Sequence, residues 1–236
     1  MEKKSMFLSQ LTSIYIVLII LWLLYFSIHS LFASLKFKQL ILHAYPWFMP
    51  RYRLTFNLLA IVLLIPPVVL MFSYPGNLVW QWTGISRYFA NTLALLALFG
   101  FTWSLRSYDS SEFLGTRQLK EGRQAIKEQE SFHLSVFHRF VRHPWYAFSL
   151  VLIWTRDMYV SYLISAILMS LYFILGSYLE EKKLIAYHGD QYRLYRKYVA
   201  ALVPLPWRFL SKQKAAEIMD LNIAADSAKT AGGTNV

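Results

Sequence analysis

Long runs of apolar residues without Asp, Glu, Lys or Arg recur along the chain and predict membrane-spanning helices. Four such runs cover residues 5–35, 54–86, 88–105 and 158–179, close to or above the roughly 20 residues that a spanning helix needs. A fifth run, residues 145–155, is too short alone. It can form one arm of a helical hairpin with the run that follows, because Arg156 and Asp157 supply a polar tip. The pattern predicts an all-α, polytopic membrane protein with about five passes.

Proline, glycine and polar residues set the expected limits of these elements. Pro66 and Pro67 should kink or end the second helix, and Tyr74–Asn77 has the composition of a turn, so this span should cover roughly residues 54–73. A cleavable signal peptide over residues 1–33 is the competing interpretation. Its apolar run exceeds the roughly 7–15 residues of a signal core, which favours an uncleaved span. We expect one membrane domain over residues 1–210, with an amphipathic helix near its C-terminal end, and a disordered tail over residues 211–236.

Composition narrows the functional classes. The chain is 56% hydrophobic and 16% charged and has no cysteine, so disulfides, thiolate metal sites and a cysteine nucleophile are excluded. No metal site is predicted. The net charge of +11 can indicate nucleic-acid binding, but the basic residues border apolar spans, where anionic lipid headgroups are the nearer partner. We therefore expect membrane lipid as a partner and no nucleic acid.

The distribution of Lys and Arg predicts the orientation. Basic residues are concentrated in segments 36–53, 106–142 and 182–208, whereas the opposite side carries little beyond Lys3, Lys4, Arg87 and Arg156. Because basic loops stay on the cytoplasmic side, the three segments should be cytoplasmic and the N-terminus outside, in a bacterial inner membrane or its equivalent. Lys3 and Lys4 count mildly against this orientation.

The most informative motif is Arg142-His143-Pro144-Trp145-Tyr146, where the long basic loop meets the fourth span. Pro144 suits the first position of a helix, and the residues before a proline are extended, which places Arg142 and His143 at the helix mouth. A carboxylate or phosphate there would meet backbone N–H groups and a guanidinium. An interfacial anchor of Arg, Trp and Tyr is the alternative, and the motif taken alone favours it.

A second motif follows the last span and contains Glu180 and Glu181, then His188, Gly189 and Tyr192. Adjacent carboxylates near lipid require cationic or hydroxyl partners. Gly189 can end the helix in a left-handed cap, after which Tyr192 and Tyr195 should share one face of a short helix that folds back on the membrane surface. The alternative is that both glutamates pair with Lys182, Lys183 or Arg142 in solvated headgroup space.

Two further elements are weaker candidates for functional residues. His29-Ser30 lies near the cytoplasmic end of the first span, and a histidine inside a membrane is a functional hypothesis by default, although capping of a backbone carbonyl explains it equally well. Phe113-Leu114-Gly115-Thr116-Arg117-Gln118 follows the third span. As loop structure, this stretch can be no more than a glycine turn with paired charges.

Together, residues 142–146 followed by Glu180-Glu181, Gly189, Tyr192, Tyr195 and Pro204 resemble, in order and spacing, the C-terminal signature of the isoprenylcysteine carboxyl methyltransferase superfamily, which includes phospholipid methyltransferases. His29-Ser30 and residues 113–118 resemble its nurim and methanethiol methyltransferase branch. The similarity covers most of residues 11–207 and is strongest from Phe140 onward.

The resemblance implies a methyltransferase that uses S-adenosylmethionine. The carboxylate of this cofactor would suit Arg142, His143 and Pro144, and its sulfonium could face Trp145 or Tyr146. Its amino group or ribose would suit Glu180 or Glu181, and which glutamate makes which contact stays open. His188 and Tyr192 complete the expected cofactor site. The methyl acceptor would be lipophilic or a small thiol or carboxyl compound. The catalytic residues are unknown, with His29, Arg117 and Gln118 as candidates on the acceptor side.

Two departures from the family pattern keep an alternative open. Relatives often have glycine about six residues before the arginine of this motif and a small residue soon after its tyrosine, whereas this chain has Val136 and Phe148. Bulk at these positions favours a non-catalytic membrane scaffold or partner-binding protein that retains the fold. A sterol-reductase-like enzyme is a third hypothesis, which no glycine-rich phosphate loop supports. The oligomeric state is not predicted.

Overall fold

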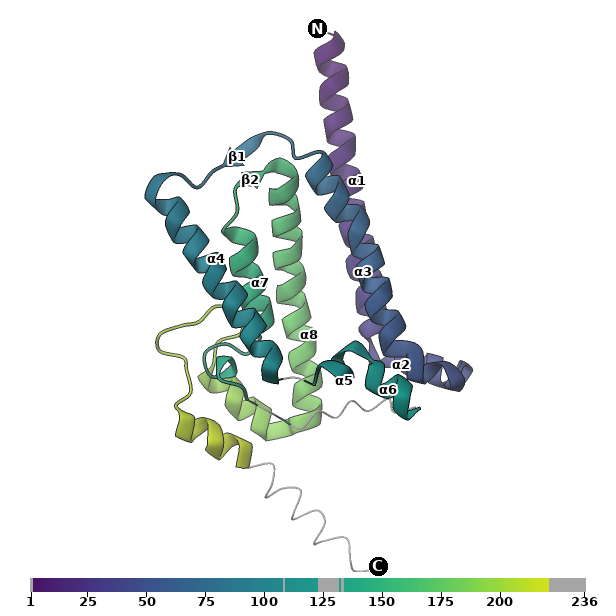
Figure 1. The fold of residues 1–236 in the computed structure, drawn as a ribbon, viewed down its shortest axis with the longest axis vertical. Coiled ribbons are helices and arrows are strands. Elements are labelled where there is room, and N and C mark those ends of the chain that lie inside the picture. Colours follow the sequence, from purple (N-terminus) through teal and green to yellow (C-terminus); the bar gives the residue numbers. More distant parts are fainter. Residues whose placement is uncertain (1, 108, 123–131, 133, 221–236) are drawn as a thin grey trace, which may run out of the picture. The chain divides into compact units, whose positions relative to one another are not determined.

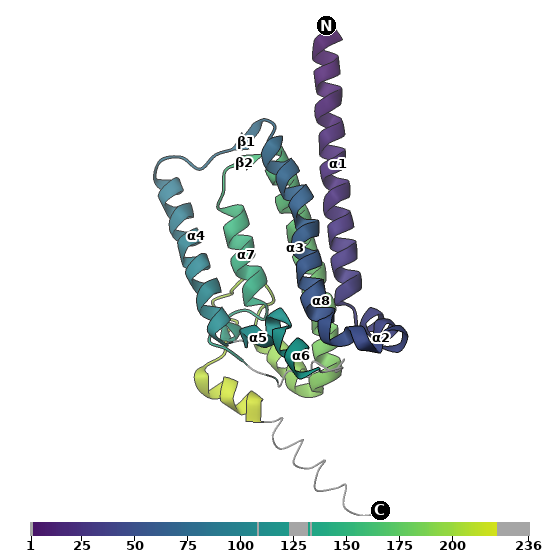
Figure 2. The same cartoon turned by 45° about the vertical axis from the view of Figure 1, so that its right-hand side comes forward.

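A computed structural model describes residues 2–107, 109–122, 132 and 134–220. By their contacts, the residues form two compact units. Unit 1 contains residues 1–93, 108–128 and 153–172, and unit 2 contains residues 94–107, 129–152 and 173–236. Figure 1 and Figure 2 show the α-helices and β-strands. In chain order, with η for a 3-10 helix, the elements are α1 (Glu2–Ala33), α2 (Leu35–Ala44), η1 (Pro46–Phe48), α3 (Met49–Ser73), β1 (Leu78–Trp80), α4 (Gly84–Ser104), η2 (Leu105–Ser107), α5 (Ser110–Leu114), α6 (Thr116–Glu121), η3 (Phe137–Arg139), α7 (Pro144–Trp154), β2 (Met158–Tyr159) and α8 (Val160–Tyr198).

Four helical stretches of the described chain are long and apolar enough to cross a membrane. They are Thr12–Ala33, Pro46–Ser73, Gly84–Ser104 and Val160–Tyr198. Helix α7 has 11 residues, about half of what a span requires. The expectation of a helical protein is therefore confirmed, with four helices that could cross a membrane, and the fifth pass through the hairpin stays a prediction.

Helix α3 continues through Pro66 and Pro67 and ends at Ser73, the limit expected for this span. The prolines therefore do not end the helix. Tyr74 caps it by donating its N–H to the carbonyl of Leu70 over 3.0 Å, and Gly76 follows at a φ of +75°. A turn at this point is thus confirmed.

Strands β1 and β2 form an antiparallel pair in unit 1 that the sequence did not predict. Leu78 pairs with Tyr159 and Trp80 with Met158. Asp157 accepts a hydrogen bond from the N–H of Trp82 over 3.0 Å and lies 3.4 Å from Arg87. The polar residues before α8 therefore fix the connection between α3 and α4.

The core of unit 1 is formed where α1 packs on α3 and on the first half of α8. Leu18, Trp22 and Met71 are its buried centre. The indole N–H of Trp22 donates to the hydroxyl of Ser165 over 2.8 Å, which satisfies a buried donor inside an apolar interface. Helices α5 and α6 contact α3 in the same unit.

The core of unit 2 surrounds the end of α8. Tyr192 and Tyr195 are buried with Leu210 and Ile218, so the face that these tyrosines share packs inside the protein and not on a membrane surface. Residues 212–220 are helical, and the carbonyl of Ile218 accepts a 2.7 Å hydrogen bond from Gln191. The described residues 212–220 thus pack in unit 2, and the expected disordered tail over residues 211–236 stays a prediction. Residues 221–236 lie outside the described residues.

Gly189 interrupts α8 with non-helical dihedral angles, φ +53° and ψ −126°. The expected break at this glycine is present, and its φ is positive. Its ψ differs from the value near +47° of a left-handed cap, so the chain bends and then resumes its helix over residues 190–198. This bend leaves Glu180 and Glu181 before it and Tyr192 after it.

Candidate functional site

The motif at residues 141–144 is anchored by backbone hydrogen bonds within unit 2. Val141 forms a parallel bridge with Ala200. Arg142 donates its N–H to the carbonyl of Ala200 over 2.8 Å, and His143 donates to Ala201 over 3.1 Å. Pro144 is the first residue of α7. The expected helix start is confirmed. The backbone hydrogen bonds to Ala200 and Ala201 hold Arg142 and His143 in place before the helix.

Arg142 and Glu181 form a buried ion pair. The Nε and Nη2 atoms of Arg142 lie 2.8 and 2.6 Å from Oε1 of Glu181. Nη1 donates to the backbone carbonyls of Arg196 and Val199. The two side chains are only 10% and 9% exposed. The alternative of pairing in solvated headgroup space is thus correct for one partner, Arg142, but the pair is buried.

His143 lies between the two glutamates. Its Nε2 is 3.2 Å from Oε1 of Glu181, and its Nδ1 is 3.3 Å from Oε2 of Glu180. Glu180 differs from Glu181 because 47% of its side chain is exposed. Burial alone lowers the pKa of His143, but the hydrogen bonds and charges of Glu180 and Glu181 outweigh it and raise this pKa above its usual value. We refer to Arg142, His143, Glu180 and Glu181 as the ion-pair cluster.

The raised pKa predicts how stability depends on pH. A group whose pKa is higher in the folded state contributes stability below its unfolded pKa, about 6.5 for histidine, and this contribution is lost as the pH rises through the folded value. We expect the thermal midpoint of the purified protein to decrease above about pH 6.5 relative to that of the His143→Gln variant. Parallel pH profiles of the two proteins would contradict the assignment.

Trp145 and Tyr146 lie beside the cluster but differ in their contacts. The indole N–H of Trp145 donates to the hydroxyl of Ser104 over 2.8 Å, which fixes this ring against α4. The ring of Tyr146 stacks on His143, with centroids 5.5 Å apart, and on Phe173 at 5.1 Å. Of the two rings expected to face a sulfonium, Tyr146 is therefore the one in contact with the cluster.

Tyr192 and His188 complete the predicted cofactor residues. Tyr192 is buried, and within the described residues its hydroxyl has no hydrogen-bond partner. Such a buried hydroxyl usually indicates a missing polar partner. The ring of His188 lies 5.3 Å from that of Phe132, an aromatic residue of the long loop, and 6.5 Å from that of Tyr187.

The acceptor-side candidates lie in unit 1. The Nδ1 atom of His29 and the hydroxyl of Tyr172 form a 2.8 Å hydrogen bond, in which the tautomer of His29 decides which atom donates. The hydroxyl of Ser30 is 3.2 Å from the same oxygen. Phe56 places its ring 5.0 Å from that of His29. His29 thus bonds to a tyrosine hydroxyl in an aromatic setting, and not to the backbone carbonyl that the alternative required.

Arg117 and Gln118 are on α6, and their contacts are local. Arg117 pairs with Asp109, Glu112 and Glu121 over 3.2, 3.7 and 3.0 Å. Gln118 donates to the carbonyl of Glu112 over 3.2 Å, and its Oε1 is buried with no partner in the described part of the chain. The alternative of a glycine turn with paired charges describes this element correctly, and Arg117 is engaged within it.

The two departures from the family pattern do not fill the ion-pair cluster. Val136 is exposed. Phe148 packs against Phe137 and against Gly100 of α4, where an added Cβ would lie 2.7 Å from the phenyl ring. The bulk of Phe148 is thus accommodated by a glycine on the neighbouring helix. The scaffold alternative stays a hypothesis.

Tyr172 and Arg196 have contacts that the sequence did not predict. Tyr172 is in the uncharged run of α8 and has no motif around it, so its hydrogen bond to His29, 143 positions away, has no local signal. Arg196 adds its Nε at 3.8 Å from Oε2 of Glu181. The requirement that a buried carboxylate be paired is the only sequence signal that pointed to such a residue.

The helices and the cluster define a class: a protein with four described helices long enough to cross a membrane and a largely buried ion-pair cluster between the start of α7 and the last long helix, α8. Comparison with known proteins gives the family. The chain is 33% identical over 184 residues to the methanethiol S-methyltransferase of Pseudomonas deceptionensis. The aligned region covers 75% of this chain and 67% of the relative. It therefore belongs to the methanethiol S-methyltransferases, within the isoprenylcysteine methyltransferase-like membrane methyltransferase family. The resemblance stated from the sequence is confirmed.

Other relatives carry the same name. The methanethiol S-methyltransferase of Pseudomonas sp. (strain GM41(2012)) is 37% identical over 117 residues, with 47% of this chain and 45% of the relative covered. That of Mycobacterium tuberculosis is 33% identical over 144 residues, with 56% and 59% covered. The chain thus spans about half the length of these two relatives. No family model matches the chain, and no solved structure matches it significantly.

Proposed function

We propose that this protein is a membrane methyltransferase that uses S-adenosylmethionine to methylate a small thiol such as methanethiol. The observation that carries the proposal is the buried contact of Arg142 and His143 with Glu181, next to the half-exposed Glu180. Membership of the methanethiol S-methyltransferase family supports it. The transfer would form a bond between the thiol sulfur and the methyl group, break the bond from that methyl to the sulfonium, and yield a methyl thioether, S-adenosylhomocysteine and the proton of the thiol.

The residues present fit the cofactor, and we assign them different roles. Glu181 and Arg142 satisfy each other and hold the cluster together. Glu180 keeps exposed carboxylate surface for an ammonium group or ribose hydroxyls. The hydroxyl of Tyr192, which has no partner among the described residues, and the ring of Tyr146 are the other candidate contacts. Which glutamate binds the cofactor was open from the sequence, and the difference in exposure favours Glu180.

The cofactor supplies a methyl group on a positively charged sulfur that is already activated. The protein then has to hold the acceptor in line and exclude water, which accounts for most of the acceleration in such a transfer. The thiolate is the nucleophilic form of a thiol, so a group must take its proton. We propose His29, held by Tyr172, as that group.

Titration calorimetry with S-adenosylmethionine tests the cofactor site. We expect the wild type to bind and Glu180→Gln to bind about 10- to 100-fold more weakly, because a hydrogen bond to a charged group contributes about 1.5–3 kcal/mol. Glu217→Gln is the matched control, since Glu217 pairs with Lys214 at an exposed site. We expect this control to bind like the wild type.

Headspace detection of dimethyl sulfide tests the reaction. Wild-type protein supplied with methanethiol and S-adenosylmethionine should produce it, and His29→Ala should reduce the rate while leaving cofactor binding unchanged. If the wild type neither binds the cofactor nor methylates a thiol, a prenylcysteine or a lipid, the scaffold alternative is correct.

A further inference from the structure

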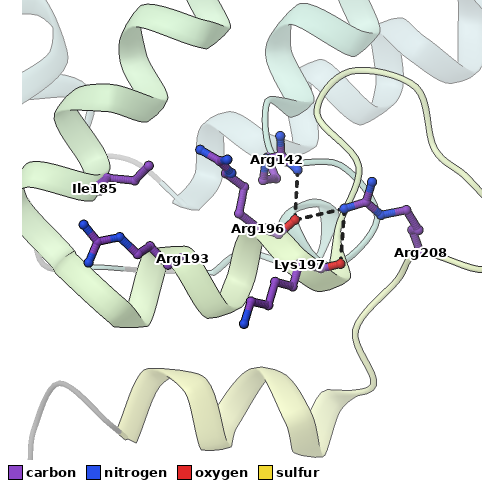
Figure 3. A pocket seen from close by; sticks show the side chains of 6 residues that line it. All are labelled: Arg142, Ile185, Arg193, Arg196, Lys197 and Arg208. Atoms are coloured by element: carbon purple, nitrogen blue, oxygen red, sulfur yellow. Dashed lines mark hydrogen bonds between the residues drawn. The ribbon is translucent and has the colours of Figure 1, made fainter.

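A second candidate site lies in unit 2 and is lined in part by Arg142. It is a cavity of about 560 Å³ lined by Arg142, Ile185, Arg193, Arg196, Lys197 and Arg208. Five of these six residues are cationic, and none is acidic. Figure 3 shows their side chains around the cavity. We refer to this cavity as the basic pocket.

Nearby carboxylates neutralise only part of this charge. Glu181 pairs with Arg142 and lies 3.8 Å from Arg196, and Asp190 is 2.8 Å from Arg193. The ammonium group of Lys197 forms no ion pair or hydrogen bond with the described residues. Among the described residues, two carboxylates therefore face five cations, and the uncompensated positive charge attracts an anion.

Two guanidinium groups of the basic pocket are held in place. Arg208 uses Nη2 to donate to the carbonyls of Arg196 and Lys197 over 3.0 and 3.2 Å, as Figure 3 shows. In the described part of the chain, the Nε and Nη1 atoms of Arg208 donate no hydrogen bond, so their N–H groups can reach a ligand. Arg142 is fixed by Glu181. The planar guanidinium of Arg208, held in this way, matches the oxygens of a phosphate, and its fixed geometry reduces the entropy lost on binding. Arg142, whose nitrogen atoms are engaged by Glu181, Arg196 and Val199, contributes positive charge.

The charge of the basic pocket separates it from the cofactor site. S-adenosylmethionine has one negative and two positive charges at neutral pH, so a cavity lined by five cations and no carboxylate repels it. A ligand with one or more phosphate charges has the complementary sign. We propose that the basic pocket binds the phosphate group of an anionic ligand.

Two sources of phosphate have this chemistry, an anionic phospholipid headgroup and a free phosphate compound. The residues around Arg208 favour the lipid. Trp207 and Phe209 are 76% and 53% exposed, and exposed aromatic residues next to arginine are typical of the membrane interface. Ile185 adds an apolar wall to the same cavity.

Thermophoresis with the full-length protein in detergent tests the proposal. The probes are short-chain phosphatidylglycerol, short-chain phosphatidylcholine and inorganic pyrophosphate. We expect phosphatidylglycerol to bind more tightly than phosphatidylcholine, pyrophosphate to compete with it, and added salt to weaken both. Binding of pyrophosphate without phosphatidylglycerol would support the proposal with a free phosphate compound as the ligand.

Two double variants with the same net charge provide the control. Arg193→Gln/Lys197→Gln changes the basic pocket without touching Arg142, and we expect about tenfold weaker binding, since each exposed cation contributes a fewfold. Lys183→Gln/Lys212→Gln changes exposed lysines outside the lining and should bind within about twofold of the wild type. Equal weakening in both variants, or no binding of any probe to the wild type, would overturn the proposal. Calorimetry with S-adenosylmethionine on the same variants shows whether the cofactor site is intact.

Discussion

Replacing Arg142 by methionine is expected to lower the free energy of unfolding by about 3–5 kcal/mol, the usual cost of removing one partner of a buried ion pair. Glu181 would keep a charge in a site where its side chain is 9% exposed, with His143 as its nearest other partner. The carbonyl of Val199 would also lose this donor, whereas that of Arg196 keeps its hydrogen bond from Arg208. The loss reflects an uncompensated charge and an unpaired carbonyl more than the attraction between the two ions.

Chemical denaturation in detergent measures this effect, with two variants as comparisons. Arg193→Met removes an arginine whose partner Asp190 has a side chain 95% exposed, and we expect little change because exposed pairs contribute little. Arg142→Met/Glu181→Leu removes both charges of the buried pair and should recover part of the loss. A single variant as stable as the wild type, or a double variant no more stable than Arg142→Met, would contradict this account.

The spans were predictable from the sequence because their signal is local. An uncharged run needs no information about its neighbours, and α3 ends at Ser73 where the turn residues begin. Pro144 begins α7 for an equally local reason, its fixed φ. The pair β1–β2 had no such signal. Each strand has only two or three residues, too few to show an alternating pattern.

The candidate site was predictable in its membership and not in its division of roles. The spacing of the motifs led us to expect Arg142, His143, Glu180 and Glu181 in one place, and they are in contact. Burial decides which glutamate is structural, and burial depends on the packing of the chain beyond Gly189. The helix over residues 212–220 illustrates the same limit, since its composition is polar and its stability comes from contacts with Gln191 and Tyr192.

Replacing Gly115 by alanine is expected to destabilise the protein by about 2–4 kcal/mol. This cost combines the strain of a left-handed backbone at alanine with the steric overlap of its Cβ. Gly115 joins α5 to α6 at a φ of +86°. A Cβ at this position would lie 2.7 Å from the backbone nitrogen of Leu54 and 2.9 Å from Cβ of Arg53. Asn57 holds the same turn against α3 through the carbonyls of Phe113 and Leu114, so the backbone cannot move away without losing these hydrogen bonds.

Gly122→Ala separates the two contributions. Gly122 ends α6 at a φ of +62°, and an added Cβ there would meet no atom of the described residues within 4 Å. Its substitution should therefore cost only the conformational part, about 1–2 kcal/mol. The difference between the two variants, measured by denaturation under the same conditions, gives the contribution of the close approach to α3. If Gly115→Ala costs no more than Gly122→Ala, the turn at residues 113–118 is not packed against α3 as described.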